Sequence, residues 1–399
     1  MLLQKPAFLL FYHARAAEAS FGEWLGVLWH GLSLDCTVAG YVTAFPVLVA
    51  LASFWIPLSQ RVWRIVLTVY FSLIALVTAA IFAVDLNLYG YWGFRLDGSV
   101  LIYLSDPGEA LASASWGEVL RQILIMLVYA GAMIWSYRWI LRLFRVEPVP
   151  LRGRIVPTVA TLLIGGLTFL AIRGGVTVAT ANVSKVYFSS NMFLNHAATN
   201  PVFSFLSSVG DNENYAEAYP FFEEERRKTL FEELRGNRPG ADAGTPRLLR
   251  SDRPNVVLIL LESFGRTIMD ETVNGEPVMP NMQRFKREGV WFENFFANSF
   301  RTDRGQVAVL CGFPAQTTMS IMKLPRKSAT LPSLARSLGR EGYRSVFMYG
   351  GDLNFTNQAS FMYSTGWEEL IWQKDMQLDA PTSKWGYADD VVVDLFGDE

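Results

Sequence analysis

The sequence predicts a multi-pass α-helical membrane domain followed by an α/β domain. Three observations support this fold class. The 399 residues are 51% hydrophobic and only 18% charged, with a mean hydropathy of +0.21, and the apolar excess lies almost wholly before residue 180. That first part contains four long apolar runs. After residue 255, short apolar runs alternate with helical patterns, which is typical of a mainly parallel sheet.

The four apolar runs are nearly uncharged, and each approaches the ~20 residues that a membrane-spanning helix requires. They cover residues 36–57, 65–84, 119–141 and 155–172. A further apolar patch at 7–12 is too short to span a bilayer, so it is either the end of a helix or an interfacial segment. Together these runs predict a transmembrane domain over residues 1–176.

The loops between the runs predict the orientation of the helices. The connections at 58–64 and 139–154 are rich in arginine, whereas the loop at 85–118 is acidic and has Arg95 as its only basic residue. The positive-inside rule therefore assigns both arginine loops to the cytoplasm. We therefore expect a protein of the cell (inner) membrane in which everything after about residue 175 is extracytoplasmic. The acidic loop fits a substrate entrance or, as we prefer, a solvated connection.

Residues 177–254 are predicted to be a juxtamembrane linker. The stretch 182–210 is polar and aromatic and is expected along the membrane surface. A helical charge pattern predicts a helix at 221–234, and Gly, Pro, Ala and Arg predict a flexible strap at 236–254. For His196, a surface or structural role is the preferred interpretation over metal binding.

Residues 255–399 are predicted to be the α/β domain. Strands are expected at 256–261, 290–296 and 343–349, and helices at 280–289, 305–310 and 331–341. Ligands of parallel sheets bind outside the carboxyl ends of the strands. Glu262, Thr302 and the turn at 349–352 are expected at that edge.

A threonine hydroxyl is a poor nucleophile near neutral pH, so Thr302 needs a base or a metal ion. None of the three histidines lies after residue 250, and a divalent cation is therefore the simplest activator. Glu262 and Thr302 would supply two of its oxygen ligands. The N–H groups of the helix that begins near Arg304 favour a phosphate, and Arg301 and Arg304 suit phosphate oxygens.

Each candidate also has a purely structural interpretation. Thr302 is compatible with the role of a helix N-cap, and Glu262 with that of a carboxylate that caps a neighbouring segment. Arg301 and Arg304 are compatible with solvated surface side chains. Asp352 and Asn354 fit turn residues, which we favour, and Cys311 fits a small buried side chain better than a nucleophile.

At these residues the sequence resembles the lipoteichoic acid synthase family of membrane-anchored phosphotransferases, within the alkaline phosphatase/sulfatase superfamily. The matching pieces are Leu-Leu-Glu-Ser-Phe at 260–264, Phe-Arg-Thr at 300–302, Leu-Cys-Gly-Phe-Pro at 310–314, and 343–352 with the Asn-Phe pair at 354–355. The resemblance covers roughly residues 250–399. It implies that this part is an extracytoplasmic, sulfatase-like α/β domain.

The resemblance also implies a chemistry. Thr302 would take a phosphoglycerol-type or phosphoethanolamine group from a phospholipid and pass it to a glycan, glycolipid or growing polymer outside the membrane. It implies Thr302 as nucleophile and metal ligand, Glu262 as a second ligand, and Mn²⁺ as the usual metal, with Zn²⁺ or Mg²⁺ as alternatives. The candidate substrate-binding residues are Arg301, Arg304, Tyr349, Asp352 and Asn354.

Two departures from the family pattern matter. The family completes its metal site with a downstream Asp-His pair, and this chain has no candidate for it before Glu399. We therefore expect the domain to be incomplete at its C-terminus and nearly inactive as it stands, and we leave open a truncated extra helix at the N-terminus. Tyr349 stands where the Gram-positive synthases have a histidine that holds the headgroup, which bears on glycerol-phosphate specificity.

Three other functions compete with this one. A sulfuric ester hydrolase is disfavoured, because sulfatases need Cys or Ser in a C/S-x-P-x-R pattern and Thr302 is followed by Asp303 and Arg304. A phosphodiesterase of the same superfamily and a non-catalytic membrane scaffold stay open. The net charge of −2 indicates no nucleic-acid partner.

Overall fold

The computed structural model describes residues 1–98, 100–103, 115–145, 150–209, 221–235, 251–316 and 319–398. They divide into two compact units, which we describe separately. The larger unit comprises Met1–Asn212 and Val307–Glu399, and the smaller unit comprises Glu213–Gln306. Much of the predicted acidic loop at 85–118 and most of the predicted strap at 236–254 lie outside the described residues.

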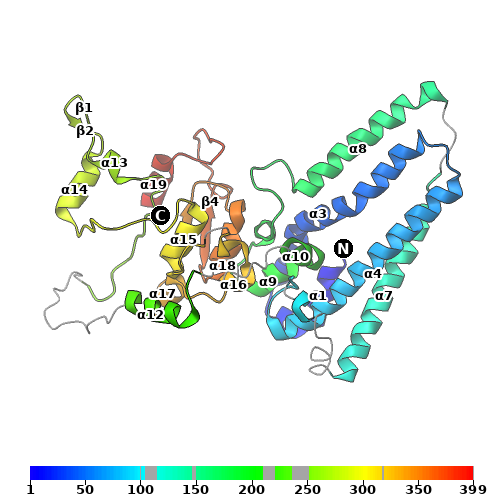
Figure 1. Ribbon diagram of the computed structural model, residues 1–399, viewed down its shortest axis with the longest axis horizontal. Helices are drawn as coiled ribbons and strands as arrows, with labels where there is room; N and C mark the ends of the chain where they lie inside the picture. Colours follow the sequence, from blue (N-terminus) through cyan, green and yellow to red (C-terminus); the bar gives the residue numbers. More distant parts are fainter. Residues whose placement is uncertain are drawn as a thin grey trace. The chain divides into compact units, whose positions relative to one another are not determined.

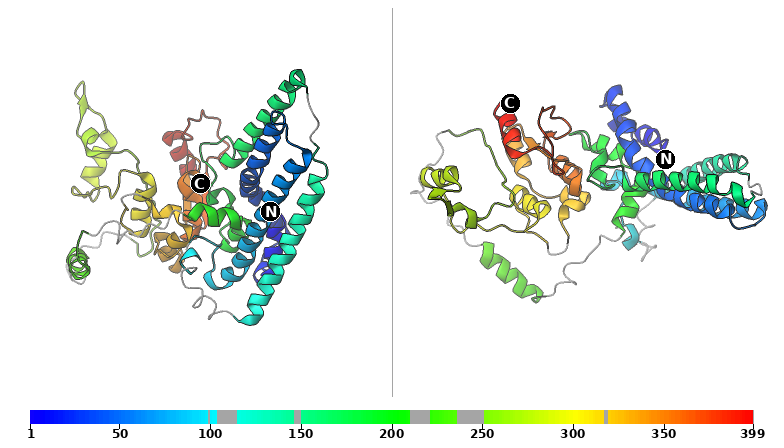
Figure 2. Two further views of the ribbon diagram at one scale, coloured as in Figure 1. Left: turned by 45° about the vertical axis from the view of Figure 1, so that its right-hand side comes forward. Right: turned by 90° about the horizontal axis from the view of Figure 1, so that it is seen from above.

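Four segments of the larger unit are helical, long and apolar enough to cross a membrane. They are α3 (Phe21–Ser53), α4 (Gln60–Trp92), α7 (Trp116–Leu141) and the span Leu151–Arg173, which contains α8 (Ile155–Arg173). Figure 1 shows α3 beside α8 and α4 beside α7, and the views of Figure 2 agree. Each predicted apolar run falls on one of these helices, so this part of the fold class is confirmed.

The outer surfaces of these helices suit a lipid environment. α8 buries only Thr161 among its side chains, whereas Val156, Leu163 and Leu167 are 75%, 67% and 67% exposed. Apolar surface of this extent is unfavourable in water and compatible with hydrocarbon chains. With 33 residues each, α3 and α4 are about 50 Å long, so part of each lies outside a hydrocarbon core of about 30 Å. The chain is therefore a membrane protein.

Local sequence sets where the long helices begin and end. α3 begins at a capping box in which the Glu23 N–H donates to Ser20 Oγ and the Glu23 carboxylate accepts from the Ser20 N–H, at 3.3 and 2.7 Å. α7 begins with the same device, formed by Ser115 and Glu118. α4 ends at Gly93, whose φ of +71° is favourable for glycine.

Three short helices form a hydrophobic core with α3 and α4. They are α1 (Gln4–Phe11), α9 (Met192–Ala198) and α10 (Pro201–Ser208). Within the stretch 182–209, Val186 and Leu194 are completely buried in this core; the expected position of the stretch along the membrane surface stays a prediction. Its apolar side chains pack on α3 and on the buried ring of Phe8. The patch at 7–12 falls largely on α1, which buries Phe8 and Leu9 and leaves Leu10 exposed.

Residues 307–398 complete the larger unit. The parallel strands β3 (Val346–Tyr349) and β4 (Glu369–Trp372) pair with Val346 opposite Glu369. Helix α17 (Leu334–Arg340) begins where Ser333 Oγ accepts from the Arg336 N–H at 3.1 Å. The predicted helix and strand in this region are confirmed. The remaining elements are η3 (Ile321–Lys323), α16 (Pro325–Ser328), η4 (Phe355–Asn357), α18 (Gln358–Ser364) and α19 (Asp389–Asp398).

The described residues of the smaller unit form helices and a short hairpin. Its elements are α12 (Glu224–Arg235), α13 (Arg266–Met269), β1 (Thr272–Val273), β2 (Glu276–Pro277) and α14 (Pro280–Glu288). The helices predicted near 221–234 and 280–289 are confirmed as α12 and α14. β1 and β2 are joined by Asn274 and Gly275, which both have positive φ, as a two-residue hairpin turn requires.

Two predicted strands of this region were wrong. Residues 256–261 and 290–296 are not strands, and the six apolar side chains from Val256 to Leu261 are 39–67% exposed. A strand that is apolar on both faces needs paired neighbours and covering helices. Among the described residues neither segment has a hydrogen-bonded neighbouring strand. Glu262 therefore does not stand at a strand end.

We expect Asn200→Ala to destabilise the larger unit by about 2–4 kcal/mol. Asn200 Oδ1 caps α10 by accepting from Val202 N–H and Phe203 N–H at 3.0 and 3.2 Å, and its Nδ2 donates to the buried Asp35 at 2.7 Å. The variant loses a cap, about 1 kcal/mol, and a hydrogen bond to a buried carboxylate, about 1–3 kcal/mol. Thermal unfolding in detergent measures the change.

The matched control is Asn191→Ala. Asn191 caps α9 through the Phe193 N–H at 3.1 Å but is exposed and does not contact a buried carboxylate. It should cost only about 1 kcal/mol. Equal losses in the two variants would show that the bond to Asp35 contributes nothing.

Candidate active site

Thr302 is the first residue of α15 (Thr302–Cys311). The N–H groups of Arg304 and Gly305 donate to the Arg301 carbonyl at 3.1 and 2.9 Å, which starts the helix. The Thr302 side chain is half-buried. The sequence predicted this placement of a hydroxyl at a helix start, where free N–H groups and the helix dipole favour an anion.

The first turn of α15 concentrates charge around Thr302. Arg301 Nε lies 3.7 Å from Asp303 Oδ1; the Arg301 side chain is 50% exposed and that of Asp303 only 5%. The Arg304 guanidinium carbon lies 6.0 Å from the centre of the Phe300 ring. An acidic residue in the first helical turn is stabilised by the dipole. Asp303 had been given no role from the sequence, although its position in that turn was the available signal.

Glu262 lies in the same smaller unit but in a different setting. It is exposed, and it precedes Ser263, whose φ of +57° belongs to the left-handed region. Among the described residues, no hydrogen bond or ion pair joins Glu262 to Thr302. The described part of the chain also contains no group of three or more His, Cys, Asp or Glu side chains that could hold a metal ion. The residues present therefore do not form a complete metal site.

The turn after β3 carries the other candidates, all in the larger unit. Tyr349 is the last residue of β3 and pairs with Trp372. Asp352 Oδ1 accepts from the Asn354 N–H at 2.9 Å and from Asn354 Nδ2 at 2.8 Å, which is an Asx-type turn. The Asn354 carbonyl accepts from Asn182 Nδ2 at 2.7 Å, so the turn is tied to the segment that follows α8.

The glycines of this turn are required by close backbone approach. A Cβ on Gly351 would lie 2.5 Å from the Trp385 carbonyl oxygen. The neighbouring Gly350 carbonyl accepts from the Tyr387 N–H at 3.0 Å. The segment around Trp385 therefore packs directly on the turn that carries Asp352 and Asn354.

The structure thus places six of the seven sequence-predicted site residues in two sets, and Glu262 belongs to neither. Arg301, Thr302 and Arg304 share the start of α15, and Tyr349, Asp352 and Asn354 share the turn after β3. The two sets belong to different units. Cys311 is buried, and burial raises the pKa of its thiol to about 11, so it stays protonated at neutral pH and is no nucleophile.

A family model described as Sulfatase matches residues 254–399. This region is therefore similar to a sulfatase domain over 146 of the 399 residues. We call it the sulfatase-type segment. It includes Glu262, Thr302 and the turn after β3, and Thr302 occupies a helix start within it.

Curated relatives match the same part of the chain. Phosphoglycerol transferase I of Xanthomonas campestris pv. campestris (strain B100) is 35% identical over 155 residues, which are 36% of this chain and 22% of that protein. Lipoteichoic acid synthase 1 of Bacillus subtilis (strain 168) is 31% identical over 130 residues, 29% of this chain and 19% of that protein. The match spans about a fifth of the length of these relatives.

A solved structure of a protein in the alkaline phosphatase superfamily from Vibrio parahaemolyticus is also similar to part of the chain. The matched residues are 28% identical and make up 30% of this chain and 29% of the chain in that structure, with a TM-score of 0.29. A score this low does not demonstrate a common overall fold. The resemblance of the sequence to the lipoteichoic acid synthase family is nevertheless confirmed by the family model and the curated relatives.

We expect Gly351→Ala to destabilise the sulfatase-type segment by about 1–3 kcal/mol, because the added methyl meets backbone rather than a side chain that can move. The control is Gly339→Ala on α17, where a Cβ meets nothing within 4 Å. That change should be neutral or stabilise the protein by about 0.5–1 kcal/mol. Unfolding followed by tryptophan fluorescence compares the two, and similar unfolding midpoints would contradict the close approach.

Proposed function

We propose that the protein transfers a phosphoglycerol-type group from a phospholipid to an acceptor outside the cytoplasm, with Thr302 as the nucleophile. The observation that carries the proposal is a half-buried hydroxyl on the first residue of α15, flanked by Arg301 and Arg304, inside a sulfatase-type segment. Relatives named phosphoglycerol transferase and lipoteichoic acid synthase support it.

The transfer proceeds in two balanced steps. In the first, Thr302 Oγ bonds to the phosphorus of the donor, the bond from phosphorus to the diacylglycerol oxygen breaks, and diacylglycerol leaves with the proton that Thr302 loses. In the second, an acceptor hydroxyl bonds to phosphorus, the bond to Thr302 breaks, and the acceptor proton returns to Thr302. Backbone N–H groups at the start of α15 and the two guanidinium groups would stabilise charge on the phosphoryl oxygens.

A divalent cation, Mn²⁺ before Zn²⁺ or Mg²⁺, is a separate part of the proposal. Such a cation would lower the pKa of the threonine hydroxyl and so supply the nucleophile. Glu262 and Thr302 offer the oxygen ligands that it prefers. The described residues by themselves do not complete a metal site.

The remaining substrate contacts are assigned to the turn after β3. Tyr349, Asp352 and Asn354 would recognise the headgroup, which is phosphoglycerol or phosphoethanolamine. The acceptor would be a glycan, a glycolipid or a growing polymer. The four apolar helices support a multi-pass protein of the cell (inner) membrane, with the sulfatase-type segment on the outer side, as the arginine-rich loops indicate.

Hydrolysis of a phosphodiester is the second candidate. The sulfatase-type match favours it, because water can replace the acceptor hydroxyl in the second step without any change in the first. Product analysis separates the two functions: a transferase forms acceptor-linked phosphoglycerol, and a hydrolase releases free glycerol phosphate.

Thr302→Ala, in the protein expressed from its gene, should reduce release of diacylglycerol from labelled phosphatidylglycerol by at least about 10³-fold, because the covalent step is lost. Thr302→Ser keeps a hydroxyl and should retain measurable turnover. Diacylglycerol release is measured in membranes that contain each variant at equal abundance. Undiminished release by the alanine variant would refute the nucleophile assignment.

A chelator should abolish the activity, and Mn²⁺ should restore it. Glu262→Gln removes one charged ligand and should raise the Mn²⁺ concentration needed for half-maximal activity by about 10–100-fold. The exposed Glu271, from the same unit, provides the control Glu271→Gln, which should leave that concentration unchanged. Mn²⁺ binding followed by electron paramagnetic resonance reports the same difference without turnover. Full activity in chelator would rule out the metal.

A further inference from the structure

The larger unit contains a cavity of about 740 Å³, which we call the juxtamembrane cavity. Its walls come from three parts of the chain: residues 94–98 after α4, residues 178–208 after α8, and the loops at 323–327 and 355–357 of the sulfatase-type segment. Small-molecule sites have volumes of about 300–1,000 Å³. None of the residues proposed for catalysis or substrate binding lines this cavity, although Asn182 on its wall donates to the Asn354 carbonyl at 2.7 Å.

Cations dominate the described lining of the juxtamembrane cavity. Arg95, Lys323, Arg326 and Lys327 face it, against Asp97 as the acidic lining residue. Arg326 is held in place, with Nη1 3.4 Å from Asp97 Oδ1 and its guanidinium carbon 4.3 Å from the centre of the Trp92 ring. Lys323 and Lys327 are exposed. The excess of positive charge favours an anionic ligand.

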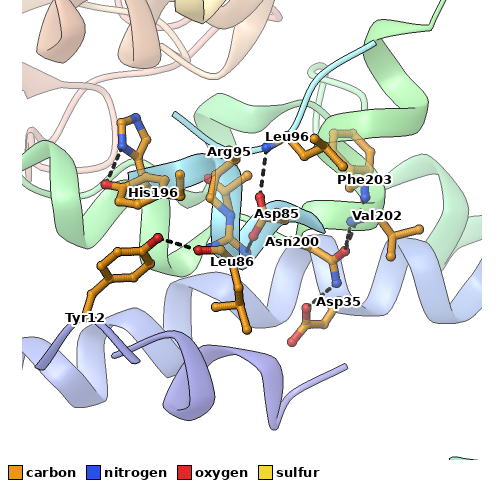
Figure 3. Close-up of polar contacts among 12 residues, drawn as sticks. Tyr12, Asp35, Asp85, Leu86, Arg95, Leu96, His196, Asn200, Val202 and Phe203 are labelled. Carbon is orange, nitrogen blue, oxygen red and sulfur yellow. Dashed lines mark hydrogen bonds and ion pairs between the residues drawn. The ribbon is translucent and has the colours of Figure 1, made fainter. Parts of the chain in front are cut away.

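Arg95 is a buried lining residue of the cavity and has donor capacity to spare. Its side chain is 4% exposed, and its Nη2 lies 3.2 Å from Asp85 Oδ2. Figure 3 shows Asp85 between Arg95 and Leu96, whose N–H donates to Asp85 Oδ1 at 2.8 Å. Arg95 Nε and Nη1 are buried and have no hydrogen-bond acceptor among the described residues. Buried donors of a charged group rarely go unpaired, which indicates an acceptor from a ligand.

His196 provides a second buried group on the same wall. It is 5% exposed, and its Nδ1 lies 3.1 Å from the Tyr89 hydroxyl (Figure 3 shows the imidazole). Burial, assisted by the nearby charge of Arg95, lowers the pKa of His196 to about 3, so the ring is neutral. When the Tyr89 hydroxyl donates to Nδ1, the proton of the ring is on Nε2. That atom has no partner among the described residues, and it offers one further donor.

We propose that the juxtamembrane cavity binds a phosphodiester with a polyol headgroup, such as a phosphoglycerol group. The buried Arg95 and His196 would donate to the phosphate oxygens, and the exposed Lys323 and Lys327 would balance the charge. Hydroxyl oxygens on the wall would accept from the glycerol hydroxyls; they belong to Thr199, Ser204, Ser207 and Ser208. The Thr199, Ser207 and Ser208 hydroxyls themselves donate to backbone carbonyls. Three phenylalanine rings supply apolar surface for the start of acyl chains: Phe94, Phe203 and Phe355. The phosphodiester comes either with its lipid or as a free headgroup.

The proposal concerns binding and does not depend on transfer by Thr302. The purified protein in neutral detergent is titrated with dihexanoylphosphatidylglycerol, sn-glycerol 1-phosphate and inorganic phosphate, and binding is followed by thermophoresis. The double variant Lys323→Gln/Lys327→Gln should weaken binding of dihexanoylphosphatidylglycerol about tenfold or more, because charge-assisted contacts to phosphate are strong. The control Lys228→Gln/Arg340→Gln removes the same charge from exposed helix positions and should change nothing.

The titrations distinguish the two possible sources of the phosphodiester, a membrane lipid and a free headgroup. Binding of the short-chain lipid alone assigns the site to a membrane lipid, and equal binding of glycerol phosphate assigns it to the free headgroup. Zwitterionic dihexanoylphosphatidylcholine should bind more weakly, because its choline cation faces the lysines. Equal affinity for both lipids, or an unchanged affinity in the double lysine variant, would overturn the proposal.

A labelling experiment locates the bound ligand. In a Cys36→Ser background, Ser207→Cys places a thiol on the cavity wall, and the exposed Ser337→Cys on α17 serves as control. Cys311 is buried with a raised pKa and should react slowly. Dihexanoylphosphatidylglycerol should slow alkylation at position 207 several-fold and leave position 337 unaffected. Equal protection of both thiols, or of neither, would place the ligand elsewhere.

Discussion

The buried ion pair between Asp85 and Arg95 is the interaction on which the arrangement of the larger unit depends. Two charges out of water cost several kcal/mol each unless other groups satisfy them. Here the Leu96 N–H donates to Asp85, and the ring of Phe8 lies 4.2 Å from the guanidinium carbon of Arg95. The pair therefore joins the last turns of α4, the chain that leaves it and the N-terminal helix α1.

A second buried polar group continues this constraint toward α10. Asp35 on α3 accepts from Lys5 Nζ at 2.6 Å and from Asn200 Nδ2 at 2.7 Å. Asn200 in turn caps α10, so the start of that helix is tied to the membrane helices. Both buried carboxylates thus sit where short helices meet long ones. Removing one partner would leave a buried charge unpaired, which gives the junction a single preferred geometry.

The sulfatase-type segment is joined to this junction through the stretch that follows α8. The Ser360 N–H donates to Ser184 Oγ at 3.0 Å, and Asn182 Nδ2 donates to the Asn354 carbonyl at 2.7 Å. These bonds couple the turn that carries Asp352 and Asn354 to η2 (Val183–Val186). The juxtamembrane cavity lies along the same joint, so a ligand there would contact both the membrane-proximal chain and the sulfatase-type segment.

The sequence by itself determined the features that depend on local patterns. Apolar length predicts the four membrane helices, the amphipathic pattern that ends before Gly342 predicts α17, and the residues around Thr302 predict a helix start. These follow from propensity, capping and hydropathy within a few residues. Only the tertiary structure decided which distant groups meet. Arg95 was one basic residue in an acidic loop, His196 an isolated histidine, and 256–261 an apparent strand. Pairing, burial and strand neighbours depend on contacts between residues far apart in the chain, which no local pattern encodes.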